Sequence, residues 1–133
     1  MVKKYLMLIA LLTIFSCTSG YPEIETSINE IDPLLTKNES LYVFDEESCS
    51  ICFDNLLTLS QKKDEFTYHV LYATSNIERY SYKNSQLWGF FDEEKITPVQ
   101  YLIIEELRNV TDTYKGNYEV VFENGQVVKI LNF

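Results

Sequence analysis

The hydrophobic and polar positions of the chain change their period several times. Leu41–Phe44 is a compact apolar and aromatic run, which is typical of a buried strand. From Cys52 to Leu59 the apolar residues recur with helical spacing, so we expect a helix that begins near Cys49. Phe66–Ala73 is again dense in residues that favour strands. Together these segments predict a strand–helix–strand unit.

The C-terminal third has the pattern of further strands. We expect a third strand over Val99–Ile104, with Pro98 at its start because proline cannot donate to a sheet ladder. Two more strands, over Tyr118–Phe122 and Gln126–Leu131, flank Asn124-Gly125, the pair favoured in type I′ turns. This part of the chain therefore predicts a C-terminal hairpin.

Three other segments have weaker patterns. Ser27–Leu35 predicts a short helix, in which Ser27 and Glu30 have the spacing of a capping box. The polar stretch Thr74–Ser85 predicts a second helix, and Asn109–Gly116 is expected to be a connection or an extra strand. The order strand, helix, strand, helix, strand, strand predicts an α/β sandwich with a mixed sheet.

The first sixteen residues have the pattern of an export signal. Lys3 and Lys4 give a short positive region, and Tyr5–Phe15 is an uncharged apolar run of eleven residues. A helix needs about 20 residues to cross a bilayer, so this run is too short to span but suits the apolar part of a signal peptide.

The end of the apolar run resembles the bacterial lipobox, in which a small residue precedes a cysteine. Here the sequence is Ile14-Phe15-Ser16-Cys17. The resemblance implies that residues 1–16 are a lipoprotein signal peptide and that Cys17 carries the lipid. It would then be followed by a tether over residues 17–26 and a domain over 27–133. An ordinary secretory signal, cut elsewhere, and an uncleaved anchor are the alternatives.

Composition and charge limit the class of protein. A hydrophobic content of 46% favours a packed fold. Loss of the two lysines in the signal changes the formal charge from −9 to −11. So acidic a surface disfavours nucleic acid and anionic headgroups as partners. Membrane attachment is therefore expected through the N-terminal lipid, on the outer side of a membrane of the bacterial cell envelope, facing the periplasm or exterior.

The three cysteines have distinct expected roles. If Cys17 carries lipid, Cys49 and Cys52 form a single C-x-x-C pair in a compartment where disulfides persist. A cysteine at a helix N-terminus is stabilised as a thiolate, and one three residues later can resolve a mixed disulfide. We therefore expect Cys49 to be the nucleophile and Cys52 the resolving thiol.

These motifs together resemble the thioredoxin family. The resemblance rests on Leu41–Phe44, the Cys49–Cys52 motif, Thr97-Pro98 before a strand and the hairpin at Asn124-Gly125, and it covers roughly residues 27–133. It implies a thioredoxin-like sandwich with a mixed central sheet, flanking helices and a C-terminal β-hairpin. It further implies that the protein is a thiol–disulfide oxidoreductase that acts on a protein thiol or disulfide partner.

The same resemblance assigns roles to two residues away from the cysteines. By it, the Thr97 backbone would bind the substrate peptide, and Pro98 would be cis and lie against the disulfide. The family's usual tryptophan before the first cysteine is Ser48 in this chain, and its Gly-Pro between the cysteines is Ser50-Ile51.

Local charge bears on the direction of exchange. Asp45, Glu46 and Glu47 precede Cys49, and Asp54 follows it. Negative neighbours raise the pKa of a thiol, and a less stabilised thiolate makes the dithiol a better reductant. The sequence therefore favours a reducing or structural site over a strong oxidant.

Two other interpretations of the cysteine pair stay open. One is a fixed disulfide in a non-enzymatic lipoprotein that uses the fold as a binding or assembly module. The other is a metal site, which is disfavoured because zinc usually takes four ligands and His69 is the only histidine. No cofactor is expected, and the sequence pattern leaves the oligomeric state open.

Three further features favour structural roles. His69 lies within a predicted strand, where a histidine with satisfied hydrogen bonds is expected rather than a catalytic base. The aromatic group Trp88, Phe90 and Phe91 is expected in the core, although one ring could lie beside the disulfide. The acidic runs 45–47 and 92–94 are expected to be solvated loops.

Overall fold

The computed structural model describes residues 20–47, 50–61, 69–113 and 116–133, and backbone only for residues 59–61. The predictions for the signal peptide, Cys17, Ser48 and Cys49 fall outside these residues. Within them the strands are β1 (Ser40–Asp45), β2 (His69–Thr74), β3 (Ile96–Gln100), β4 (Tyr118–Glu123) and β5 (Gln126–Asn132). The helices are α2 (Pro22–Ile31), α3 (Ser50–Gln61) and α4 (Leu102–Thr111), with 3₁₀ helices η1 (Pro33–Lys37), η2 (Ile77–Arg79), η3 (Tyr82–Asn84) and η4 (Glu93–Lys95).

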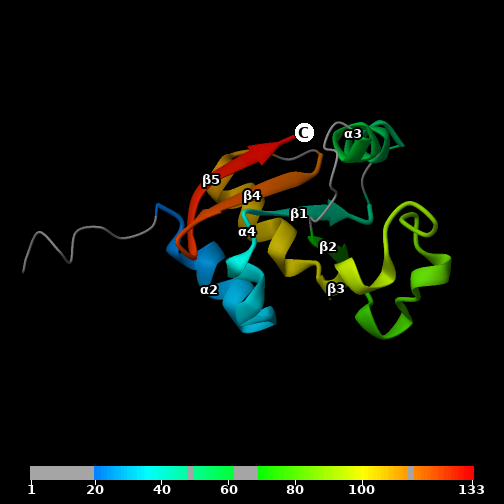
Figure 1. Ribbon diagram of the computed structural model, residues 1–133, viewed down its shortest axis with the longest axis horizontal. Coiled ribbons are helices and arrows are strands. Elements are labelled where there is room, and N and C mark those ends of the chain that lie inside the picture. The colour runs from blue at the N-terminus through cyan, green and yellow to red at the C-terminus, as the bar shows by residue number, and fades with distance from the viewer. Residues whose placement is uncertain (1–19, 48–49, 62–68, 114–115) are drawn as a thin grey trace, which may run out of the picture.

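The strands form one mixed sheet in the order β3-β2-β1-β4-β5 (Figure 1). β1, β2 and β3 are parallel, whereas β4 is antiparallel to β1 and β5 is antiparallel to β4. The expected α/β fold with a mixed sheet is confirmed. β1 lies at the centre of the sheet and β3 lies at one edge.

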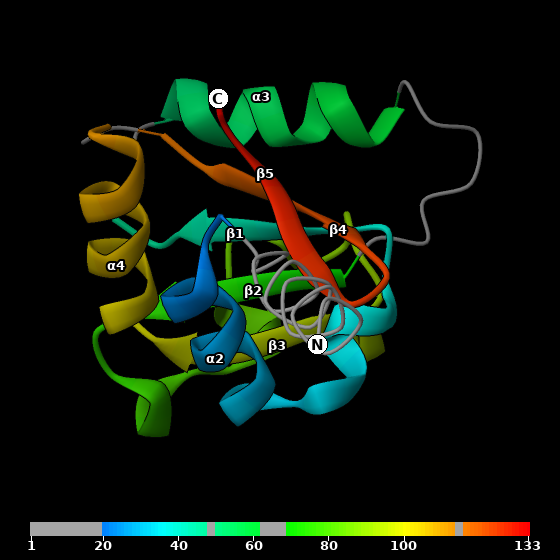
Figure 2. The same ribbon diagram turned by 90° about the vertical axis from the view of Figure 1, so that its left-hand side faces the viewer.

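Helices cover both faces of the sheet. In Figure 2, α3 runs along the top of the view, and α4 and α2 lie together at the left. Side chains alternate between the faces along a strand, so Leu41 and Val43 of β1 join the core under α2 and α4, whereas Tyr42 and Phe44 join the core under α3. Burial on both faces explains why β1 is a continuous apolar run.

The first helix begins earlier than the sequence predicted. α2 starts at Pro22, which suits the first helical position because proline has no N–H to satisfy there. Ser27 is therefore inside the helix instead of capping it, and its hydroxyl donates to the Glu106 carboxylate at 2.6 Å. The last five residues of the tether expected over 17–26 belong to this helix.

The strand predicted over 99–104 is wrong. β3 is shorter and begins earlier, and the chain enters α4 at Leu102, where Ile103, Ile104 and Leu107 face the core. In the segment 109–116, for which an extra strand was one of two alternatives, α4 continues to Thr111 and the other described residues form no strand.

The hairpin prediction is confirmed. Asn124 and Gly125 connect β4 to β5 with φ of +53° and +78°, the left-handed values that a type I′ turn requires at both positions.

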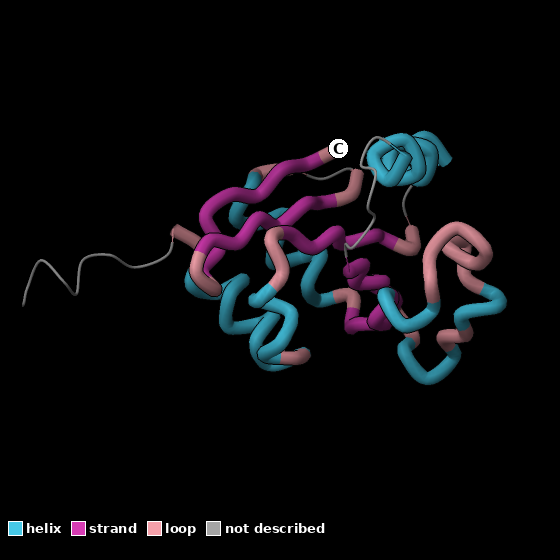
Figure 3. Tube along the Cα trace, viewed as in Figure 1, coloured by secondary structure: helices cyan, strands magenta, loops and turns pink. Residues whose placement is uncertain are grey.

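The helix predicted over 74–85 is also wrong. The segment between β2 and β3 instead contains the short helices η2, η3 and η4 joined by turns, and it lies at the right of Figure 3. We call this segment, residues 75–95, the excursion. Its Leu87 and Phe91 are buried in the core under α3.

Two hydrophobic cores are present in the part of the chain that the structure describes. The side chains that form them lie between Tyr21 and Phe133. None of the helices in the described ranges is both long and apolar enough to cross a bilayer.

Candidate functional site

The second cysteine of the C-x-x-C motif lies in the first turn of α3. Cys52 is the third residue of this helix and is 8% exposed, whereas its neighbour Ile51 is 68% exposed. The helix follows directly on β1, the central strand. Cys49 lies outside the described residues, so its role stays a prediction.

Asn117, which directly precedes β4, holds this turn against the sheet. Its side chain is fully buried, with Oδ1 accepting from the Asp45 backbone N–H at 3.2 Å and Nδ2 donating to the Cys52 carbonyl at 2.7 Å. Its own N–H donates to the Phe133 carbonyl, and its carbonyl accepts from the Phe133 N–H. One residue therefore links the end of β1, the first turn of α3 and the C-terminal end of β5.

Asn117 has no local sequence signal for such a role. A Gly-Asn pair before a strand is typical of a turn, in which asparagine bonds to its own neighbours. The partners of this side chain are 72 and 65 residues away along the chain.

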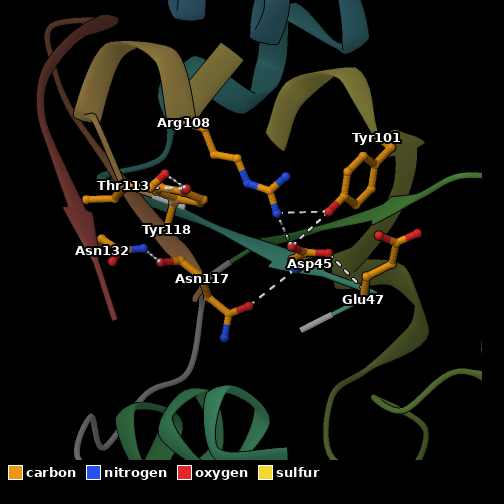
Figure 4. Close-up of polar contacts among 8 residues, drawn as sticks. All are labelled: Asp45, Glu47, Tyr101, Arg108, Thr113, Asn117, Tyr118 and Asn132. Atoms are coloured by element: carbon orange, nitrogen blue, oxygen red, sulfur yellow. Dashed lines mark hydrogen bonds and ion pairs between the residues drawn. The ribbon is translucent and has the colours of Figure 1, made fainter. Parts of the chain in front are cut away.

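Asp45 is the second functional residue that the sequence interpretation missed. We expected the acidic run 45–47 to be solvated, but Asp45 is 3% exposed. Its carboxylate accepts from Arg108 at 3.2 Å, from the Tyr101 hydroxyl at 3.1 Å and from the Glu47 backbone N–H at 2.9 Å (Figure 4). The residues around Asp45 in sequence do not indicate an ion pair, because its partner Arg108 lies on α4, far along the chain.

Arg108 and Tyr101 also interact with each other. The guanidinium donates to the Tyr101 hydroxyl at 3.1 Å and lies 5.7 Å from the ring centroid. Burial, and then the charge of Asp45, raises the pKa of Tyr101. Burial lowers the pKa of Arg108, but its contacts with Tyr101 and Asp45 outweigh this, and the net pKa is raised. A cationic Arg108 is therefore held beside the buried carboxylate.

Thr97 and Pro98 lie two strands away from β1, the strand that leads to α3 and Cys52, while Cys49 lies outside the described residues. They lie on β3, with Pro98 paired to Tyr72 of β2, which in turn pairs with Phe44 of β1. Two strand spacings of about 4.8 Å separate β3 from β1. The Thr97–Pro98 bond is trans, so the prediction of a cis proline was wrong. Proline is tolerated within β3 because an edge strand can leave one side of its backbone unpaired.

His69 forms a hydrogen bond within the sheet. The His69 Nε2 atom lies 2.6 Å from the Thr97 hydroxyl, and burial lowers the pKa of the imidazole. This agrees with the expected histidine with a satisfied hydrogen bond. Across the ranges that the structure describes, no group of three or more histidine, cysteine or acidic side chains could hold a metal ion.

The expectation that the aromatic group is entirely core was wrong for two of its three members. Phe91 is buried, but Trp88 is 57% exposed and Phe90 is 59% exposed. The Phe90 ring packs edge-on against Phe53 of α3 at 5.6 Å, and Phe53 in turn contacts Phe44. The excursion therefore places exposed aromatic rings beside the helix that carries Cys52.

The described arrangement is a helix N-terminus at the end of a central strand, with a buried cysteine in its first turn and a buried polar network beneath it. Such a junction can stabilise a thiolate and orient a second sulfur toward it. A scan against protein-family models, a search of curated proteins and a search of solved structures each found no match to this chain.

Proposed function

We propose that the protein is a lipid-tethered, thioredoxin-like thiol–disulfide oxidoreductase that exchanges disulfides with exported proteins through Cys49 and Cys52. The observation that carries the proposal is the position of Cys52. It is buried in the first turn of the helix that follows the central strand, and its carbonyl is held by Asn117.

The sheet supports the thioredoxin-like part of the proposal. Parallel β1 and β2 join through α3, and the β4–β5 hairpin adds antiparallel to β1. Asn117 directly precedes β4, the strand that pairs with β1. It takes the place at the motif that the family resemblance assigned to Pro98, and Pro98 has no part in the proposed chemistry.

The chemistry is a two-step exchange. The Cys49 thiolate attacks one sulfur of the partner's disulfide, forming a mixed disulfide and releasing the partner's other sulfur as a thiolate. The Cys52 thiolate then attacks the Cys49 sulfur and releases the partner's first sulfur. The protein's dithiol becomes a disulfide and the partner's disulfide becomes a dithiol, so two electrons and two protons pass to the partner.

The charges around the motif favour this reducing direction. Glu47 and Asp54 are exposed acids on either side of the cysteines, and negative charge disfavours the thiolate. Asp45 contributes less than the sequence suggested, because Arg108 pairs with its carboxylate.

The tether of this proposal is short. α2 begins at Pro22, so the chain from Cys17 reaches at most about 18 Å when fully extended. A lipid on Cys17 would hold the domain close to the membrane surface. Mass spectrometry of the N-terminal peptide of the mature protein tests the lipid anchor. A peptide without lipid that begins at another residue would contradict it.

Trapping of the mixed disulfide tests the exchange itself. Reduced protein, residues 20–133, is mixed with a disulfide-bonded protein, quenched with acid and alkylated. In Cys52→Ser the complex with the partner should accumulate, because the resolving thiol is missing. In Cys49→Ser it should be absent. Equal trapping by both variants, or by neither, would favour the non-enzymatic binding module with a fixed disulfide.

A further inference from the structure

Two large apolar side chains are exposed on the excursion, and one of them packs against α3, the helix that carries Cys52. Trp88 and Phe90 are both more than half exposed, and Phe90 contacts Phe53, the residue that follows Cys52. We call Phe53, Trp88 and Phe90 the aromatic patch. Exposed aromatic rings that are grouped in this way, at the rim of a reactive site, are typical of surfaces that bind another chain.

A turn at Gly89 holds Trp88 and Phe90 at the surface. Gly89 lies between Trp88 and Phe90 in sequence and has a φ of +80°. The Tyr82 hydroxyl forms hydrogen bonds to two backbone groups of this turn. The Tyr82 hydroxyl donates to the Phe91 carbonyl at 2.6 Å and accepts from the Gly89 N–H at 3.4 Å. The turn is therefore anchored to buried Phe91, while Trp88 and Phe90 face outward.

Exposed acidic residues neighbour the patch in sequence. Asp92, Glu93 and Glu94 follow Phe91 directly and are exposed, and the exposed acids Glu47 and Asp54 flank the cysteine motif in sequence, Asp54 next to Phe53. A ligand that covers the rings would bring its own flanking groups near these carboxylates. Charge complementarity therefore favours a segment with lysine or arginine next to its apolar side chains.

We propose that the aromatic patch is the docking surface for the polypeptide substrate, and that it selects partner segments with apolar and basic residues beside the cysteine. The proposal rests on the proposed exchange function, whose substrate class it specifies. The rings would hold the segment by apolar contact next to the first turn of α3, and the neighbouring acidic residues would orient it. This would place the partner's disulfide at the motif.

The test compares two peptides that differ only in their flanks. Each carries one cysteine as a mixed disulfide with thionitrobenzoate, whose release is coloured. One peptide has Phe, Leu and Lys around the cysteine, and the other has Ser and Glu. The reduced protein, residues 20–133, should react at least about tenfold faster with the first peptide than with the second, which corresponds to the loss of about 1.4 kcal/mol expected of an aromatic anchor.

Three variants locate the effect. Trp88→Ser and Phe90→Ser should each remove most of the preference, by lowering the rate with the apolar, basic peptide far more than the rate with hydroxyethyl disulfide, a small neutral substrate. Leu34→Ser alters another exposed apolar residue, 61% exposed on η1, and should change neither rate. Trp88 is the only tryptophan, so its fluorescence also reports binding of a cysteine-to-serine version of each peptide.

The outcomes separate this inference from the function beneath it. Exchange with hydroxyethyl disulfide but equal rates for the two peptides would overturn the docking surface and leave the oxidoreductase standing. An equal loss of preference in Leu34→Ser would also overturn it. No exchange with any disulfide, together with fluorescence changes specific to the basic apolar peptide, would support the docking surface and contradict the oxidoreductase.

Discussion

Replacement of Asn117 by alanine tests the link between the sheet and the cysteine helix. In the wild-type protein the side chain is 0% exposed and satisfies two backbone groups, the Asp45 N–H and the Cys52 carbonyl. Alanine removes both bonds and leaves no atom in a position to replace them. The Cys52 carbonyl still has the helix to pair with, but the Asp45 N–H loses the partner that the structure gives it.

The expected loss follows from these contacts. A buried hydrogen bond contributes a net of about 1 kcal/mol, and a buried donor left without a partner costs about 1–3 kcal/mol. For Asn117→Ala we therefore expect the free energy of unfolding to fall by about 2–4 kcal/mol. That is a large part of the roughly 5–15 kcal/mol by which domains are usually stable.

Urea unfolding followed by Trp88 fluorescence measures the change. The matched control is Asn109→Ala, an exposed asparagine on α4, which should change stability by no more than about 0.5 kcal/mol. Both variants are measured with the cysteines reduced and oxidised. A loss below about 1 kcal/mol for Asn117→Ala in both states would refute the idea that this side chain secures the turn.

Three other changes have definite expectations. Arg108→Met should cost about 2–4 kcal/mol in the same urea assay, a little below the range for fully buried pairs because the Arg108 side chain is 27% exposed; a loss below about 1 kcal/mol would contradict the ion pair. Burial raises the pKa of Tyr72 to about 12, so the folded state keeps a proton that the unfolded chain loses near pH 10, and stability should fall as pH rises from 10 toward 12. Tyr72→Phe should reduce this slope, and an unchanged slope would assign it to other groups. Gly116→Ala should destabilise the protein by more than Gly125→Ala, since both have positive φ but only the Gly116 Cβ would collide with the Phe133 main-chain oxygen; equal thermal melting points would contradict that contact.

The features that the sequence predicted well are those with local causes. β1 was evident from a run that is buried on both faces, and the hairpin from Asn124-Gly125, whose backbone preference does not depend on the rest of the chain. The early start of α2 and the whole of α4 were missed for the opposite reason. Pro22 fell in the expected tether and Pro98 was expected to open a strand, whereas Pro22 opens α2 and Pro98 lies within the edge strand β3, and both places depend on the tertiary arrangement.

The candidate site divides in the same way. Cys52 was predicted from its spacing and from the change of period around it. Asn117 and the Asp45–Arg108 pair were not, because their contacts join residues more than 60 positions apart. A charged residue that ends an apolar strand looks the same in sequence whether it faces water or an arginine on a distant helix.

The redox potential of the Cys49–Cys52 pair tests the central claim most directly. Residues 20–133 are equilibrated in glutathione and dithiothreitol buffers, and the thiols are counted by alkylation and mass. We predict a midpoint between about −120 and −270 mV, in the range of exchange catalysts and toward its reducing end. A midpoint below about −300 mV, reached slowly, would mark a structural disulfide and contradict the oxidoreductase.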